Sequence, residues 1–155
     1  MNAHGRVGQG TMTKRWDGLR VAGRRDFPGV ARSAGAARKW VVELLCGQMA
    51  AETLETAELL VSEVVTNAIL HSDSGGSGGL IMVRVGLSGD LVHIEVVDDG
   101  SVTSVPAIRT TDDDSLSGRG LSWVDRLAVI WGADRDDEAG GVVWFRLPRD
   151  GSATF

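Results

Sequence analysis

The apolar positions of the chain repeat with two periods, and these periods predict where its clearest helix and strand lie. Between about Thr53 and Ser72 the apolar residues recur at intervals of three and four, the spacing of one face of an α-helix. From Leu91 to Val97 apolar and polar residues alternate strictly, as in a strand with one buried face. His93 falls on the polar face of this strand, and we expect it to be exposed.

Weaker patterns predict the remaining elements. A loose alternation indicates a first strand from Leu19 to Phe27, which Pro28-Gly29 ends, and Ser33 is a suitable N-cap for a helix to about Met49. The other expected segments are strands at Leu80 to Val85, Ala128 to Trp131 and Val142 to Leu147, an irregular stretch at Ser101 to Ser117, and a short helix from Gly118 to about Leu127. This order is typical of an α+β two-layer sandwich with helices on one sheet face.

Composition indicates one globular domain. The 155 residues are 43% hydrophobic and 24% charged, enough to form a core without disulfides. No apolar run approaches the roughly 18 residues of a membrane span, and the polar N-terminus lacks the apolar segment of a signal peptide. We therefore expect a flexible leader at 1–18, a folded domain at 19–148 and a tail at 149–155, in the cytoplasm and without membrane contact. Cys46 is the only cysteine, and its apolar neighbours predict that it is buried.

Charge is distributed unevenly along the chain. The net charge of −5 argues against direct nucleic-acid binding, which needs clustered basic residues. Basic residues nevertheless gather between Lys14 and Lys39. They form either a solvated face or a surface for a partner.

Two polar residues on the long helix are candidates for metal and acid–base chemistry. Glu63 and Asn67 lie one helical turn apart, off the apolar face. The amide oxygen of asparagine is a suitable ligand for Mg²⁺, and a glutamate one turn earlier can deprotonate or orient a nucleophile. An ordinary solvent-facing pair is the alternative interpretation.

Two glycine-containing segments suggest nucleotide chemistry. Asp98-Asp99-Gly100 ends the alternating strand, where a carboxylate can accept a hydrogen bond from an exocyclic amine such as adenine N6, and the glycine lets a base approach the backbone. A hairpin turn is the alternative, but the long irregular stretch that follows disfavours it. Gly118-Arg119-Gly120 opens a helix and can present backbone N–H groups to phosphate. A flexible hinge explains this lone pair of glycines equally well.

Taken in order, these segments resemble the N box and the two glycine boxes of the GHKL ATPase superfamily. Within it, the chain is most similar to the short anti-sigma-factor serine/threonine kinase branch, and the resemblance covers about Leu19 to Pro148. The segments concerned are Leu60 to Ala68, Val97 to Gly100 and Ser117 to Leu121, with Phe27-Pro28-Gly29 and Gly140 to Trp144 in support. The resemblance implies the Bergerat fold, a mixed, mainly antiparallel sheet covered on one face by helices, with the nucleotide between the helices and a mobile lid.

The resemblance also implies a role for each motif residue. Asn67 would bind Mg²⁺ at the phosphates, and Glu63 would be the general base for the attacking hydroxyl. Asp98 would bind adenine N6, and Gly100 would line the base pocket. The lid would span Ser101 to Ser117, and the phosphates would contact Gly118, Arg119, Gly120 and Leu121.

The function implied is that of an ATP- and magnesium-dependent regulator. Members of this branch phosphorylate a serine or threonine on a STAS-type anti-anti-sigma partner and capture a sigma factor, usually as homodimers. Leu116 stands where better-studied kinases carry a basic residue, Val142 where relatives often have threonine, and Asp112 to Asp114 place negative charge near the expected phosphates. Kinase turnover therefore stays open against two alternatives: a non-catalytic, nucleotide-gated protein-binding module and the detached catalytic domain of a histidine kinase.

Overall fold

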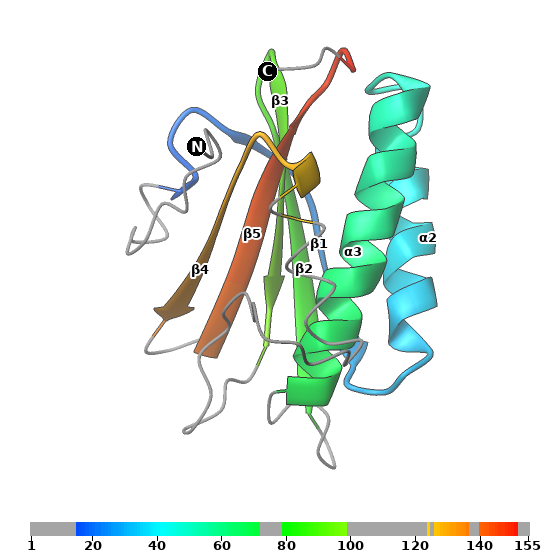
Figure 1. Cartoon of the computed structure of the whole chain (residues 1–155), viewed down its shortest axis with the longest axis vertical. Coiled ribbons are helices and arrows are strands. Elements are labelled where there is room, and N and C mark those ends of the chain that lie inside the picture. The colour runs from blue at the N-terminus through cyan, green and yellow to red at the C-terminus, as the bar shows by residue number, and fades with distance from the viewer. Residues whose placement is uncertain (1–14, 72–78, 99–123, 125, 137–139, 152–155) are drawn as a thin grey trace.

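The computed structural model describes residues 15–71, 79–98, 124, 126–136 and 140–151. Its elements run in the predicted order (Figure 1). They are β1 (Arg20–Pro28), α2 (Ser33–Leu45), α3 (Ala51–His71), β2 (Leu80–Leu87), β3 (Leu91–Val97), β4 (Ile130–Asp136) and β5 (Gly140–Pro148). Of the helix predicted from Gly118, only Val124, Arg126 and Leu127 are described, and they are helical.

The five strands form one sheet in the order β1-β2-β3-β5-β4. All four pairings between the described strands are antiparallel, so the parallel component of a mixed sheet does not occur among them. β3 lies in the middle of the sheet, and its register sets Val97 opposite Val142 of β5. The end of β3 therefore lies beside the beginning of β5.

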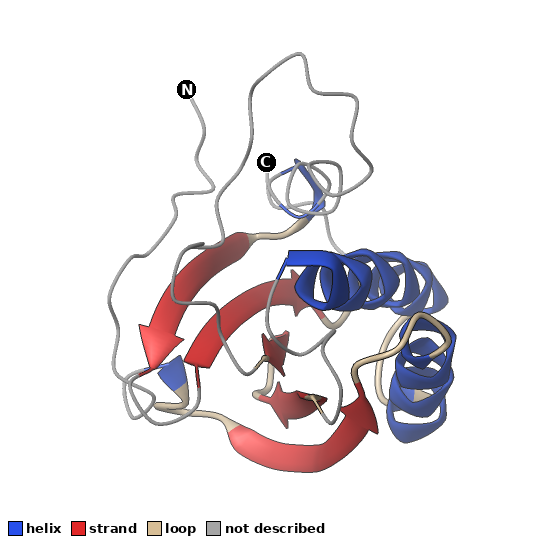
Figure 2. Ribbon diagram, turned by 90° about the horizontal axis from the view of Figure 1, so that it is seen from below, coloured by secondary structure: helices blue, strands red, loops and turns tan. Residues whose placement is uncertain are grey.

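Both long helices cover the same face of the sheet, which confirms the predicted α+β two-layer arrangement (Figure 2). α3 packs over β2, β3 and β5, whereas α2 packs against α3 and β1. The apolar stripe of α3 supplies much of the core, because Leu60, Val61 and Val65 are fully buried. Each such side chain stabilises the fold by about 1.5–3 kcal/mol. No helix of the described part of the chain is long and apolar enough to cross a membrane.

Two predictions about α2 were wrong. Ser33 is its first helical residue rather than its N-cap, and its hydroxyl donates a hydrogen bond to the carbonyl of Pro28. The helix ends at Leu45 instead of Met49, just before Gly47, whose φ of 81° favours glycine. Cys46 lies just beyond the helix and is exposed rather than buried, because its place after the last turn removes it from the helical apolar stripe.

The face of the sheet opposite the helices carries a buried ionic network. Glu95 is 0% exposed and accepts hydrogen bonds from Arg84 Nη2 at 2.6 Å, Arg15 Nε at 2.9 Å and His93 Nε2 at 2.8 Å. Arg15 Nη1 also donates to Asp134 Oδ2 at 3.2 Å. Charges this deeply buried are tolerated only when they are paired.

His93 contradicts its predicted exposure, because its exposed fraction is 0%. Trp16 packs edge-on against its ring, with ring centroids 5.0 Å apart, and Trp144 lies on another side at 5.5 Å. Arg146 Nε donates to Nδ1 at 3.0 Å, so Nδ1 is unprotonated and the ring is the neutral tautomer with its proton on Nε2. Burial accordingly lowers the pKa of His93 below 6.5, although the hydrogen bond to Glu95 opposes that shift.

Candidate functional site

The predicted site residues that the structure describes come from the end of β3 and the second half of α3. Asp98 directly follows β3, whose last residue is Val97. The C-terminal part of α3 lies at this same end of the sheet (Figure 1). Side chains alternate along a strand, and Val97 belongs to the apolar cluster on the helix-free face, so Asp98 falls on the face that α3 covers. The fold therefore brings the strand end and the helix stripe to a common region.

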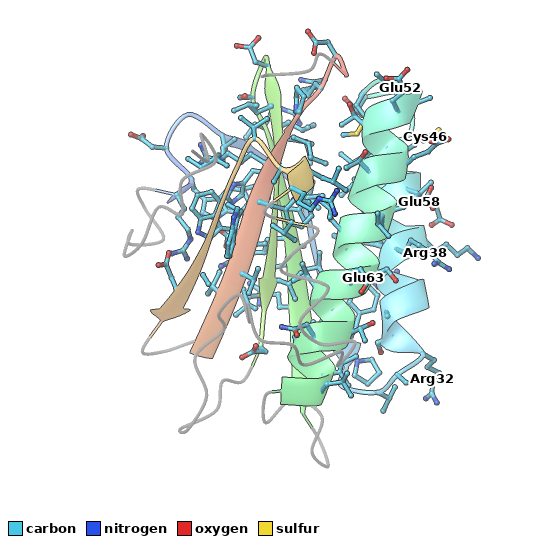
Figure 3. All side chains as sticks on the ribbon, viewed as in Figure 1. Arg32, Arg38, Cys46, Glu52, Glu58 and Glu63 are labelled. Atoms are coloured by element: carbon cyan, nitrogen blue, oxygen red, sulfur yellow. The ribbon has the colours of Figure 1, made fainter. Side chains whose placement is uncertain are left out.

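Glu63 and Asn67 are both partly buried on α3. Figure 3 shows Glu63 in the half of α3 that lies nearer the end of β3, with Glu58 and Glu52 successively farther away. Their helical neighbours Val64 and Ala68 are buried against the sheet. The two polar side chains thus lie at the rim of the helix–sheet interface, neither sealed in the core nor fully in solvent. This is a suitable position for groups that contact a bound molecule.

The carboxylate of Asp98 is buried and held by backbone. Its exposed fraction is 7%, and Gly141 donates its N–H to Oδ1 at 3.2 Å. In return, the N–H of Asp98 donates to the carbonyl of Gly141 at 2.9 Å. A carboxylate so placed can accept a further hydrogen bond from an amine while its orientation is restrained.

Sequence reasoning missed Gly141. It considered the neighbouring Val142, where relatives often have threonine, but Val142 is fully buried with Val97 and Trp144 in the cluster on the other sheet face. A Cβ atom on Gly141 would lie 2.9 Å from Oδ1 and 3.2 Å from Oδ2 of Asp98. The Gly140-Gly141 pair is visible in the sequence, but only the strand register sets it opposite Asp98.

These residues fit magnesium-bound ATP. The buried Asp98 carboxylate, close against a glycine backbone, suits a base that offers an exocyclic amine. Asn67 supplies an amide oxygen, a hard ligand that Mg²⁺ accepts. No group of three or more histidine, cysteine, aspartate or glutamate side chains that could hold a metal occurs within the described ranges. In nucleotide sites Mg²⁺ commonly takes most of its ligands from phosphate and water.

The phosphate end of the predicted site lies outside the described residues. The residues concerned are the base-pocket glycine Gly100 and the expected phosphate-binding segment Gly118, Arg119, Gly120 and Leu121. Leu116 and the acidic run Asp112 to Asp114, at which the sequence differs from the better-studied kinases, lie outside them as well. Their predicted roles stay predictions.

A groove of about 450 Å³ between α2 and β1 is a second feature that sequence reasoning did not locate. We call it the α2–β1 groove; it is lined by Arg25, Asp26, Phe27, Pro28, Arg32, Ser33, Ala36, Lys39, Trp40 and Glu43. Phe27 and Trp40 meet edge-on at 6.1 Å between ring centroids, and the guanidinium of Arg25 lies 5.4 Å from the Phe27 ring. Residues 19–45 contain six basic and two acidic residues, a net charge of +4 in a chain of −5. The lining itself holds three basic and two acidic residues, a net charge of +1, so the groove combines aromatic walls with a small excess of positive charge.

Comparison with known protein families places most of the chain in one of them. A family model described as "Histidine kinase-like ATPase domain" matches residues 27–147, from the end of β1 almost to the end of β5. The matched range includes all four residues on which the site rests: Glu63, Asn67, Asp98 and Gly141. No curated protein matches the chain.

Proposed function

The chain belongs to the histidine kinase-like ATPase domain family, and we propose that it is a magnesium-ATP-dependent regulatory protein. In this proposal it is an anti-sigma factor that phosphorylates a serine or threonine on a STAS-type anti-anti-sigma protein in the cytoplasm. The observation that carries the proposal is the buried Asp98 carboxylate, fixed by Gly141 on the sheet face that α3 covers. The resemblance of the motif set to the anti-sigma kinase branch supports the finer assignment.

Each described site residue has a distinct part in this proposal. Asp98 accepts a hydrogen bond from the exocyclic amine of adenine and so holds the base. Asn67 binds Mg²⁺, which would neutralise phosphate charge during transfer. Glu63 accepts the proton of the attacking hydroxyl as that oxygen bonds to the γ-phosphorus, while the bond from this phosphorus to the β–γ bridging oxygen breaks and ADP leaves. The phosphates would contact the segment from Gly118 to Leu121.

Titration of Mg-ATP into the wild type and Asp98→Asn tests the base assignment. The two carboxylate oxygens of Asp98 can accept from both the adenine amine and the Gly141 N–H. Asparagine has only one side-chain oxygen, so its NH₂ group would face one of these two donors and one hydrogen bond is lost. A hydrogen bond to a charged group contributes about 1.5–3 kcal/mol, so the dissociation constant should rise roughly 10- to 150-fold. Asp90→Asn, at the exposed turn between β2 and β3, is the matched control and should bind like the wild type. Equal affinity of Asp98→Asn and the wild type would contradict the proposal.

Phosphotransfer tests the catalytic assignment. The protein is incubated with Mg-ATP and a purified STAS-type anti-anti-sigma protein, and phosphoserine or phosphothreonine is measured. Glu63→Gln should lower the rate by about 100-fold or more, as loss of a general base does. Glu58→Gln, also partly buried on α3, should leave the rate unchanged.

The same assay separates the alternatives. A non-catalytic, nucleotide-gated module would bind ATP and change its affinity for the partner without forming phosphoprotein. A histidine-kinase catalytic domain would instead give an acid-labile phosphohistidine on its partner. Either result would reject the serine/threonine kinase assignment while leaving ATP binding intact.

The α2–β1 groove supports the capture of a protein partner. Its aromatic walls lie among three basic residues, which outnumber the two acidic residues of the lining. This combination suits an acidic segment with an apolar side chain. Reversing charge with Arg32→Glu and Lys39→Glu together should weaken sigma-factor or anti-anti-sigma binding by about tenfold or more in a pull-down or titration. Arg20→Glu, exposed on β1 but outside the groove lining, is the control. Unchanged partner affinity in the double variant would remove the groove from the proposal.

A further inference from the structure

We infer that Gly141 is a positioning residue that orients the Asp98 carboxylate and thereby makes the site select adenine over bases without an exocyclic amine. The inference deepens the proposed function and rests on it, because it assumes that Asp98 faces the base. It adds a residue that belongs to none of the predicted motif roles.

The first argument is the hydrogen-bond pattern at the sheet end. The backbone N–H of Asp98 donates to the Gly141 carbonyl, which extends the β3–β5 ladder by one residue beyond the Val97–Val142 pair. The N–H of Gly141 donates to the side-chain oxygen Oδ1 of Asp98. The carboxylate is therefore tied to the rigid backbone of the neighbouring strand, which opposes rotation about its terminal torsion.

The second argument is the space that the missing side chain leaves. Glycine within a strand weakens it and often marks a place where another group approaches the backbone closely. At Gly141 that group is the whole carboxylate, because a Cβ would lie 2.9 Å from Oδ1, 3.2 Å from Oδ2 and 3.4 Å from Cγ. Any other residue would therefore compete with Asp98 for the same volume.

The nature of this conflict predicts how the protein responds to an added methyl group. The atoms in conflict belong to the end of a short, rotatable side chain, whereas both backbones are paired in the sheet. Gly141→Ala should therefore turn the carboxylate and leave the strands in place. A turned carboxylate no longer accepts the hydrogen bond from the amine of adenine. Hypoxanthine presents a carbonyl oxygen at that position and donates no such bond, so its binding should not change.

Base selectivity separates a positioning role from a merely structural one. Dissociation constants for Mg-ATP and Mg-ITP are measured with the wild type, Gly141→Ala and Gly89→Ala; Gly89 has open space around it and serves as the control. The wild type should prefer ATP by about 100-fold, since a buried carboxylate repels a carbonyl oxygen. Gly141→Ala should bind ATP about tenfold more weakly and ITP within twofold of the wild type, so the ATP preference falls by about tenfold. Gly89→Ala should keep the wild-type ratio.

Two results overturn the inference. An unchanged ATP/ITP ratio in Gly141→Ala, whether both affinities hold or fall together, would show that Gly141 does not act through the base. Equal binding of ATP and ITP by the wild type would do so as well; it would also remove the adenine role of Asp98, while leaving Mg-ATP binding and the proposed kinase activity standing. Failure of the wild type to bind ATP would instead overturn the proposed function itself.

A double-mutant cycle keeps the coupling testable if Gly141→Ala is poorly folded. The urea midpoint is measured for Gly141→Ala in the wild-type and Asp98→Ala backgrounds. If the carboxylate is what requires glycine, the methyl group lowers the midpoint in the wild type and has little effect once Asp98 is alanine. Equal losses in both backgrounds would show that the glycine serves the strand alone.

Discussion

Replacing Glu95 by glutamine should lower the free energy of unfolding by about 3–5 kcal/mol, the loss observed when one partner of a buried ion pair is removed. Glu95 is fully buried and accepts hydrogen bonds from Arg84, Arg15 and His93. Glutamine has nearly the same shape, so the packing is kept while the negative charge is lost. The amide N–H groups of glutamine would also face the N–H donors of Arg84, Arg15 and His93, and would find no acceptor there.

The pKa of Glu95 also reflects how strongly the fold favours its ionised form. Burial raises the pKa, but the hydrogen bond from His93 and the neighbouring positive charges outweigh it and lower the pKa from 4.5 to about 2. His93 is neutral near pH 7, so the lasting charge comes from Arg84 and Arg15. A shift of this size corresponds to about 3 kcal/mol in favour of the folded, ionised state.

Urea unfolding at pH 7, followed by tryptophan fluorescence and circular dichroism, measures the loss. With a slope of about 2 kcal/mol/M, the midpoint of Glu95→Gln should fall by about 2 M at unchanged slope. Glu55→Gln, exposed on α3, is the matched control and should stay within about 0.5 kcal/mol of the wild type. A loss below about 1 kcal/mol in Glu95→Gln would refute the reasoning, because it would mean that water or another group replaces the lost charge.

Three more features of the fold, namely the titration of its buried groups, a tight glycine contact and an exposed thiol, can be tested directly. The free energy of unfolding should fall as the pH drops below 6.5, because His93 takes up a proton in the unfolded chain but resists it when buried in the fold. It should fall again between pH 4.5 and about 2, where Glu95 is protonated in the unfolded chain and still ionised in the fold. Urea midpoints across this range check both steps, and the lower step should vanish in Glu95→Gln. Gly86→Ala should lower the free energy of unfolding by about 1–3 kcal/mol and change tryptophan fluorescence, because a Cβ there would lie 2.5 Å from the Trp16 ring. An unaltered urea midpoint would contradict the close packing of Trp16 on Gly86. Cys46 should react with a thiol reagent in the native protein nearly as fast as in urea, and strong protection would contradict its exposure.

Local periodicity was sufficient for the main elements. The predicted strand from Leu91 to Val97 is β3 without change, and the predicted long helix differs from α3 only at its ends. Both depend on repeats within a few residues, which the chain carries wherever it folds. The end of α2 was less predictable, because apolar residues continue past Leu45 while the backbone turns at Gly47.

Part of the candidate site could be predicted from the sequence, and part of it depends on the fold. Residue chemistry and order predicted Asp98, Glu63 and Asn67 as site residues, and these lie at the end of β3 and in the second half of α3. Gly141 could not be found in this way, since Gly140-Gly141 before a strand is equally typical of a turn. Its importance arises from a partner 43 positions away in the chain.

The sequence by itself determined which residues share a face, and the tertiary structure decided what covers that face. Alternation along β3 puts His93 and Glu95 together on its polar side, and a polar side is normally solvated. In the fold, Arg15 and Trp16 lie against this side, and Arg84 and Arg146 come from the neighbouring strands β2 and β5. Periodicity records the geometry of one strand alone, whereas burial depends on segments that meet it from elsewhere in the chain. For that reason the alternation of β3 predicted its two faces correctly and the exposure of His93 incorrectly.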